Sequence, residues 1–425
     1  MGKHAAKSAK PQQTQKPQQK SPWRVGLLAF IVSSVIVTVV GMAILWPNAD
    51  DVKLAENFSQ TFSGNYEQVN GTITLVDNTA CNSPDTGRVF SDSPAVPLEP
   101  AAVDCVRALV EITAGEHEGQ KTQLVTYAQP GEPEFSTGDK IRMVASEDTN
   151  GEAIYTFADY QRGTALIVWG IVLIIAMGTF AAWRGVRALL GLVITLGIVG
   201  IFLLPGLASG HDAMWLALLC GAAILLIVVP MVHGLNWKSA AALAGTLVAL
   251  VLSAVLSWAA IETTNLRGLG DENHLKIINY LPEVSISGLL LASFIIGTLG
   301  VLNDVTISQA STINELAEID DDATPWRLFT GAMSVGRDHI SSMIYTLVLG
   351  YTGAALPLLL LLSLAERPLI QTLTSDVMAG ELLRSGVGAL TLTLAVPITT
   401  LIAAWTVPGD EPTPDDGKPR LVHRH

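Results

Sequence analysis

Long apolar stretches dominate the pattern of hydrophobic and polar positions along the chain. A helix needs about 20 mostly apolar residues to cross a bilayer. Eight stretches come near this length: 25–46, 164–182, 188–207, 214–232, 239–261, 284–302, 339–364 and 386–405. The pattern predicts a mainly α fold, a polytopic transmembrane helical bundle of about eight spans. The connections 262–283 and 365–381 are each long enough to contain a short interfacial helix.

The segment between the first two spans, 47–163, has a different pattern. Short β-branched runs alternate with turn sequences such as Pro130-Gly131. The runs are 69–76, 105–113, 123–127 and 140–144. Four or five short strands with tight turns predict a small all-β domain shaped like an oligonucleotide-binding (OB-like) barrel. Such a shape implies nothing about what the domain binds.

Composition and charge place these parts relative to the membrane. The chain is 49% hydrophobic and only 15% charged, which is typical of a polytopic membrane protein. Residues 1–24 are rich in Lys, Gln and Pro and contain no acid, so we expect a disordered tail held on the cytoplasmic side. The span 25–46 is followed by no small-residue cleavage site and is interpreted as an uncleaved signal anchor.

The acidic residues are concentrated outside the predicted membrane. Residues 47–163 contain nineteen Asp and Glu against seven Lys and Arg, a net charge of −12 out of −13 for the whole chain. We therefore expect an extracytoplasmic β-rich domain (47–163), a seven-helix membrane domain (164–406) and a disordered cytoplasmic tail (407–425), with both termini cytoplasmic. The lipid bilayer is then the first partner of the chain.

The chain has three cysteines. Cys81 and Cys105 flank a Pro- and Asp-rich insertion in the exported domain, where the compartment is oxidising. We expect a disulfide between them that contributes about 3 kcal/mol through chain entropy. The alternative is two unrelated buried thiols. Cys220 lies in the apolar stretch 214–232 and is expected to stay reduced in the bilayer.

The most unusual stretch is 297–316, GTLGVLNDVTISQASTINEL, where an apolar span becomes polar. If the helix continues, Asp304, Ser308, Ser311 and Glu315 share one face, because they are spaced by four, three and four residues. Polar groups at membrane depth must face protein, water or a solute, so the stripe is a candidate site. The alternative is a helix that merely emerges into water, because at 1.5 Å per residue Asp304 lies about 30 Å from the start of the span, at the cytoplasmic boundary.

This stretch and a second one, SVGRDHISSMIYTLVLGYTGAALPLLLLL at 334–362, resemble the YibE/F-like membrane proteins. The order of parts also fits: one anchor, an extracytoplasmic β-rich segment and a multi-span bundle, over roughly residues 65–406. The resemblance implies a polytopic protein of the bacterial cytoplasmic membrane, of a kind often regarded as a transporter. Met343, Ile344 and Tyr345 depart from the family pattern, so only Arg337 and Asp338 are carried over from it.

Arg337 is the natural partner for Asp304, because it enters the next span on the same side of the membrane. We expect the two side chains to approach each other at the cytoplasmic end of the sixth and seventh spans. Asn303, Ser308, Gln309 and Asp338 would complete a polar cluster. The candidate residues for binding a substrate or ion are Asn303, Asp304, Ser308, Gln309, Ser311, Glu315, Arg337 and Asp338.

Other kinds of chemistry have no sequence support. The nucleotide-binding, metalloprotease, serine-hydrolase and dinucleotide motifs are all missing, so we expect neither an enzyme nor a cofactor. Glu116, His117 and Glu118 are adjacent and cannot converge on one metal ion unaided, and the acids at 320–322 are interpreted as a solvated face. No clustered basic surface suggests a nucleic-acid partner.

Two functions remain. The first is a secondary transporter or permease for a small solute or ion, in which the polar stripe forms part of the path. The second is a non-transporting membrane module, a sensor, scaffold or accessory protein, whose acidic outer domain binds a protein or a component of the cell envelope. We favour transport, and the sequence does not determine the oligomeric state.

Overall fold

The computed structural model describes residues 22–48, 52–55, 67–78, 81–95, 105–127, 129–148, 150–270, 272–320, 322–365 and 367–407. The expected terminal tails, 1–24 and 407–425, lie almost wholly outside these ranges. The chain divides into two compact units. One combines residues 1–54 with 187–425, and the other contains residues 55–186. Each unit is described by itself.

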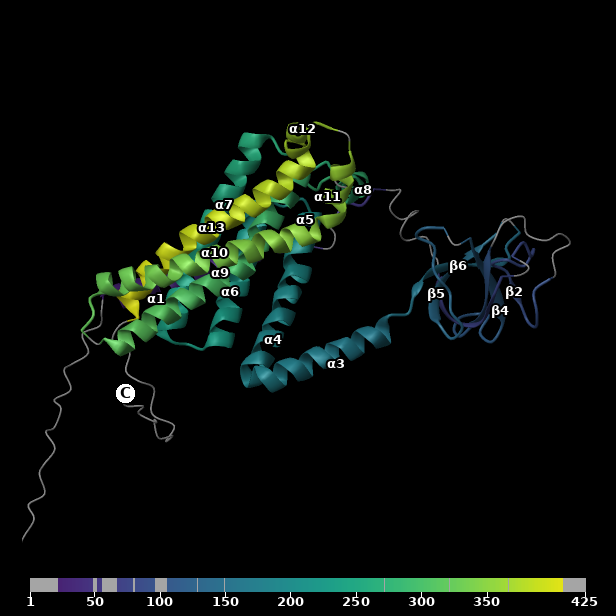
Figure 1. Ribbon diagram of the computed structural model, residues 1–425, viewed down its shortest axis with the longest axis horizontal. Helices are drawn as coiled ribbons and strands as arrows, with labels where there is room; N and C mark the ends of the chain where they lie inside the picture. Colours follow the sequence, from purple (N-terminus) through teal and green to yellow (C-terminus); the bar gives the residue numbers. More distant parts are fainter. Residues whose placement is uncertain are drawn as a thin grey trace, which may run out of the picture. The chain divides into compact units, whose positions relative to one another are not determined.

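The first unit is a bundle of long helices (Figure 1). Its long elements are α1 (Pro22–Ile44), α4 (Ala182–Ile198), α6 (Ala213–His233), α7 (Trp237–Thr264), α9 (Ile286–Ile319), α10 (Pro325–Ala354) and α13 (Asp376–Thr406). Its short elements are the π-helix η2 (Val199–Leu203), α5 (Leu204–Ala208), α8 (Glu272–Tyr280), α11 (Leu356–Leu364) and α12 (Leu369–Leu373). Figure 1 shows α7, α9, α10 and α13 side by side, and α7, α9 and α13 contact one another pairwise.

All eight predicted apolar stretches are helical. Among the described residues, seven helices are long and apolar enough to cross a membrane, or eight if α10 and α11 count as one span bent by 68°. Short helices occupy both of the long connections, as α8 and α12. Length and composition thus indicate a multi-pass membrane protein.

Helices α9 and α10 are longer than their apolar stretches. α9 continues for 17 residues beyond Leu302 to Ile319, and α10 begins at Pro325, well before the predicted start at His339. Local chemistry supports the early start, because Thr324 caps α10 through Arg327 N and proline suits the first helical turn. The extensions are also partly buried, since Ile313 and Leu328 share an apolar cluster with the N-terminal end of α7 and the C-terminal end of α13.

The second unit contains an antiparallel half-barrel sheet. Its strands are β1 (Glu67–Asp77), β2 (Val89–Phe90), β3 (Val106–Ile112), β4 (Lys121–Thr126), β5 (Lys140–Glu147) and β6 (Ala153–Tyr160). The strand order is β2-β4-β3-β1-β5-β6. A bridge between Arg88 and Ile154 joins the segment before β2 to the other edge strand. The four predicted runs are strands, whereas β2 and β6 were not predicted.

The core of the sheet follows the alternation of its strands. Ile73, Val110, Ile141 and Met143 are almost completely buried on one face. Cys81 and Cys105 are joined by a disulfide, as predicted, while Cys220 is free and buried in α6. The helix α3 (Gly163–Phe180) is grouped with this unit and has no buried residue.

Candidate functional site

A line of hydroxyl and amide side chains runs through the centre of the bundle, and we call it the core polar seam. Its members come from α7, α9 and α13, are at most 2% exposed, and each has a side-chain hydrogen bond to another helix or an unpaired side-chain atom in the described residues. They are Thr246, Ser253, Ser257, Thr298, Thr306, Gln309, Thr399 and Thr400. Such a row is unusual between helices whose remaining core side chains are almost all aliphatic.

Helical spacing puts the seam residues on facing surfaces. Ser253 and Ser257 are seven and eleven residues after Thr246, which returns them to one face of α7. Small residues allow the helices to approach closely. A Cβ on Gly245 would lie only 2.2 Å from Thr399 Oγ1. The backbone of α7 at Gly245 therefore packs directly against the side chain of Thr399 in α13.

Hydrogen bonds join the seam across helices. The Thr246 and Thr306 hydroxyls are 2.6 Å apart, linking α7 to α9. Ser253 and Thr298 make a second link between the same helices, at 3.0 Å. The Thr400 hydroxyl lies 3.0 Å from Gln309 Oε1 and joins α13 to α9.

Several polar atoms of the seam have no hydrogen-bond partner in the described part of the protein. They are Ser257 Oγ, Gln309 Nε2 and Thr399 Oγ1. Asn303 Oδ1, also on α9, is likewise buried without a partner among the described residues. Pro397 removes a backbone hydrogen bond from the same helix, because it has no N–H to donate to the carbonyl of Thr393 one turn earlier in α13. Buried polar groups are normally paired, and each exception requires an explanation.

The seam ends in titratable groups. At one end, Arg384 Nη1 binds Glu381 Oε1 at 2.8 Å, and its guanidinium lies 5.4 Å from the ring centre of Phe294. Arg384 also reaches Ser293 Oγ on α9, at 3.5 Å. At the other end, Ser308 Oγ lies 3.2 Å from His339 Nδ1 on α10. From Ser293 to Gln309 the polar line extends about 24 Å along α9, at 1.5 Å per residue.

Helix register places Asp304 relative to α13. The contacts Ser293–Arg384 and Gln309–Thr400 both have an offset of 91 residues, so α9 and α13 run in the same direction in constant register. Asp304 is therefore level with Ala395, near the middle of the apolar stretch 386–405. The helix does not end near Asp304, because α9 continues to Ile319 and has buried residues as far as Ile313.

The expected cluster around Asp304 and Arg337 is not formed. Asp304, Arg337 and Asp338 are exposed, and within the described ranges none of their side chains makes a hydrogen bond or ion pair. The antiparallel pairing of Ser308 with His339 places Asp304 level with Met343, about 9 Å along α10 from Arg337. This register is the physical reason for the correction.

The remaining predicted residues are divided between two environments. Gln309 is buried in the seam, and Ser308 reaches His339 on α10. Ser311 and Asn303 are half-buried, whereas Glu315 is exposed. The stripe predicted from Asp304 to Glu315 thus follows the edge of the buried face of α9 and not its centre.

Sequence reasoning missed most of the seam. Thr246, Ser253 and Ser257 on α7, and Thr399 and Thr400 on α13, are embedded in runs that hydropathy assigns simply to spans. A search for hydroxyl residues at helical spacing inside those runs could have found the α7 face. No comparable signal identifies which face of α13 meets it.

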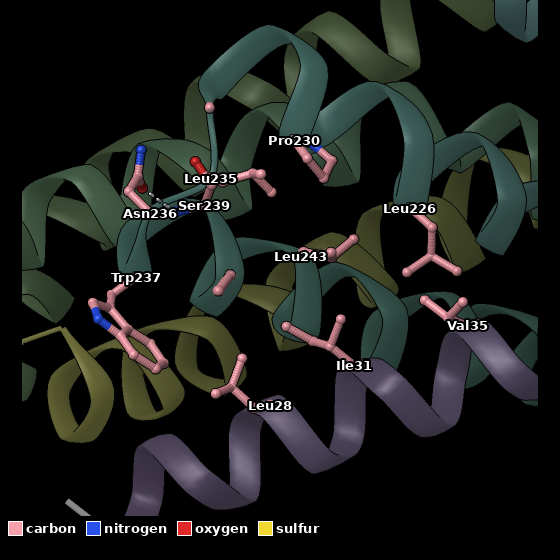
Figure 2. A pocket seen from close by; sticks show the side chains of 12 residues that line it. Leu28, Ile31, Val35, Leu226, Pro230, Leu235, Asn236, Trp237, Ser239 and Leu243 are labelled. Carbon is pink, nitrogen blue, oxygen red and sulfur yellow. Dashed lines mark hydrogen bonds between the residues drawn. The ribbon is translucent and has the colours of Figure 1, made fainter. Parts of the chain in front are cut away.

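A separate apolar groove of about 520 Å³ lies between α1 and the α6–α7 corner (Figure 2). Figure 2 shows Leu28, Ile31 and Val35 of α1 facing Leu226 and Leu243. The amide of Asn236 at its mouth is already used, because Oδ1 caps α7 through Ser239 N at 2.8 Å. The groove contains no predicted site residue and has too few polar groups to recognise a polar solute.

No group of three or more His, Cys, Asp or Glu side chains in the described residues could hold a metal ion. Along the seam the side chains offer neutral hydrogen bonding, with the Arg384–Glu381 ion pair at one end and the His339 imidazole at the other.

Comparison with known proteins places the helical bundle in a described family. Residues 169–409, more than half of the chain, match the family described as YibE/F-like protein. No curated protein and no solved structure shows significant similarity to the chain. The matched region contains every helix that contributes to the core polar seam.

Proposed function

Because the chain belongs to the YibE/F-like protein family, we propose that it is a multi-pass membrane permease that carries a small polar solute or ion along the core polar seam. One observation carries the proposal: buried polar groups from α7, α9 and α13 hydrogen-bond across these helices inside an apolar bundle, and Gln309 Nε2 among them has no partner within the described chain.

The energetics of a bilayer support this interpretation. A polar side chain inside a membrane bundle must face protein, water or a solute, because acyl chains offer no hydrogen bonds, and polar groups that face the bundle interior can line the path of a substrate or ion. Hydroxyls that bond only within their own helix would be ordinary packing groups. The seam goes further, because three of its contacts cross between helices and three of its atoms remain unpaired in the described protein. Its neutral lining favours a neutral or zwitterionic solute, or a cation bound by hydroxyl and carbonyl oxygens.

We further propose that both termini face the cytoplasm. Arg24 donates hydrogen bonds to the carbonyls of Thr406 and Val407, so α1 begins where α13 ends. Lys238 opens α7 at the same end, and Lys and Arg mark the cytoplasmic side. We expect cysteines at positions 10 and 415 to be labelled by an impermeant thiol reagent only after the cells are opened. Labelling of intact cells would contradict this topology.

Transport is best tested without assuming the substrate. Cells that express the protein and cells that lack it are compared by untargeted metabolite analysis and by elemental analysis. We expect a reproducible change in the cellular content of at least one small polar solute or ion, which then serves for uptake into vesicles reconstituted with the purified protein. Identical solute contents, at verified membrane levels of the protein, would contradict the proposal.

The alternative is a membrane module that does not transport. It is favoured by one observation: the acidic β-rich segment belongs to a compact unit with its own core and disulfide. In that case the outer domain would bind an extracytoplasmic protein or envelope component, and the solute comparison would show no difference. Cross-linking on intact cells would then capture a partner through the outer domain.

A further inference from the structure

Helix α10 has two opposite faces of very different character. Its inner face packs into the bundle through Leu328, Ala332, Gly336 and Leu347. Its outer face is exposed and polar, and we call it the α10 face. It consists of Ser334, Arg337, Asp338, Ser341 and Tyr345. Four of these residues, at 334, 338, 341 and 345, repeat with spacings of four, three and four, as in a helix that pairs with another helix.

The α10 face lies at the height of the apolar part of the bundle. A Cβ on Gly336 would meet Val396 Cγ1 at 2.8 Å, which fixes α10 against α13 at that level. Val396 is within the apolar stretch 386–405, so Arg337 and Asp338 are also level with this stretch. They are not in the aqueous region beyond the helix ends.

Charges at this height need a partner. An unpaired charged side chain facing lipid is costly, because acyl chains offer neither hydrogen bonds nor counter-charge. In the described residues, neither Arg337 nor Asp338 has an ion-pair partner within the chain. The small serines on the same face permit another helix to approach closely.

We propose that the α10 face binds a second copy of this chain. A two-fold axis along the membrane normal makes a patch meet itself, so residue i of one copy contacts residue j of the other and the reverse. Arg337 would then pair with Asp338 of the partner subunit, while Asp338 pairs with the partner's Arg337. One cation and one anion at successive positions, about 100° apart around the exposed side of α10, are self-complementary in this arrangement. The pairing does not depend on whether the protein transports.

Disulfide cross-linking in native membranes gives the first test. In a Cys220→Ala background, we expect Ser341→Cys to form a reducible dimer on mild oxidation. The matched control is Val251→Cys, an exposed apolar position in the middle of α7. A cross-link at Ser341→Cys no stronger than that at Val251→Cys would overturn the proposal, as would a product confined to a single chain, which would show that another part of the same chain covers the face.

Charge reversal gives the decisive test. Both charge variants are made in the Cys220→Ala/Ser341→Cys protein. Arg337→Asp leaves positions 337 and 338 both acidic, and Asp338→Arg leaves them both basic, so each variant alone should lose its dimer. Co-expression of the two, with different tags, should restore a cross-link between unlike copies only. The double variant Arg337→Asp/Asp338→Arg should dimerise like the parent, which separates loss of pairing from loss of folding. Undiminished dimers in either single variant, or no rescue by co-expression or by the double variant, would overturn the proposal.

Discussion

A Gln309→Leu protein is expected to fold at least as stably as the wild type and to lose the solute difference that the protein produces in cells. Leucine is close in size to glutamine and removes a buried donor, Nε2, that has no partner among the described residues. Thr400 does not become unsatisfied, because its hydroxyl also donates to Val396 O at 2.7 Å. Replacing a partly satisfied buried polar group by an apolar one of similar shape is nearly neutral or stabilising.

Uptake should fall in the Gln309→Leu protein even though its stability does not. If Gln309 donates to the transported solute, its loss removes a hydrogen bond worth about 1.4 kcal/mol, which is roughly a tenfold decrease in uptake. The measurement is uptake per folded protein, together with the melting temperature in detergent. Thr391→Val is the matched control, because Thr391 is equally buried in α13 but bonds only to Val387 O of its own helix.

The possible outcomes separate function from packing. Full uptake by the Gln309→Leu protein would mean that the seam only joins helices. A marked loss of stability with normal uptake per folded molecule would assign Gln309 a structural role. Reduced uptake in the Thr391→Val control would show that the assay responds to any buried hydroxyl.

A Gly245→Ala protein is expected to be substantially less stable than the wild type. The added Cβ would lie 2.2 Å from Thr399 Oγ1 and 2.8 Å from Thr399 Cβ. A change of rotamer moves Oγ1 but not Cβ, so α7 and α13 must separate. Overpacking of this kind costs about 1–3 kcal/mol, and the higher helix propensity of alanine offsets no more than about 1 kcal/mol of that.

Gly300→Ala is the matched control. Gly300 is in α9, and a Cβ there would meet nothing within 4 Å. We expect this variant to melt at the wild-type temperature or slightly above it, and Gly245→Ala to melt several degrees lower, at about 2–4 °C per kcal/mol. Adding Thr399→Ala to Gly245→Ala removes the nearest atom and should recover part of the loss. Equal melting temperatures for the two glycine variants would contradict the close approach of α7 and α13.

Much of the architecture could be predicted from local sequence. The eight apolar stretches are helical, because a run of about 20 apolar residues satisfies its backbone only as a helix in a membrane or a core. The pair Cys81–Cys105 follows from two cysteines around one insertion in the acidic β-rich segment. Strand β2, with two residues, and β6, which mixes aromatic and charged residues, gave no clear signal of this kind.

The candidate site was predictable only in part. Gln309 was identified because a polar stripe interrupts an apolar run, and it is buried in the structure. The ion pair of Asp304 with Arg337 was wrong, because nearness along the chain does not fix which residues are level on two antiparallel helices. The contact of Ser308 with His339 fixes that register and separates the two charges.

The sequence by itself therefore determined most of the helices and strands, which segment is the acidic β-rich one and which cysteines pair. These properties depend on the hydropathy, spacing and charge of each segment alone. Only the tertiary structure decided that Thr246, Thr306 and Thr399 belong to one line, and that Asp304 is level with Ala395. The reason is physical: the register between helices is set by close contacts between small residues, such as Gly245 against Thr399, that are more than a hundred residues apart in the chain.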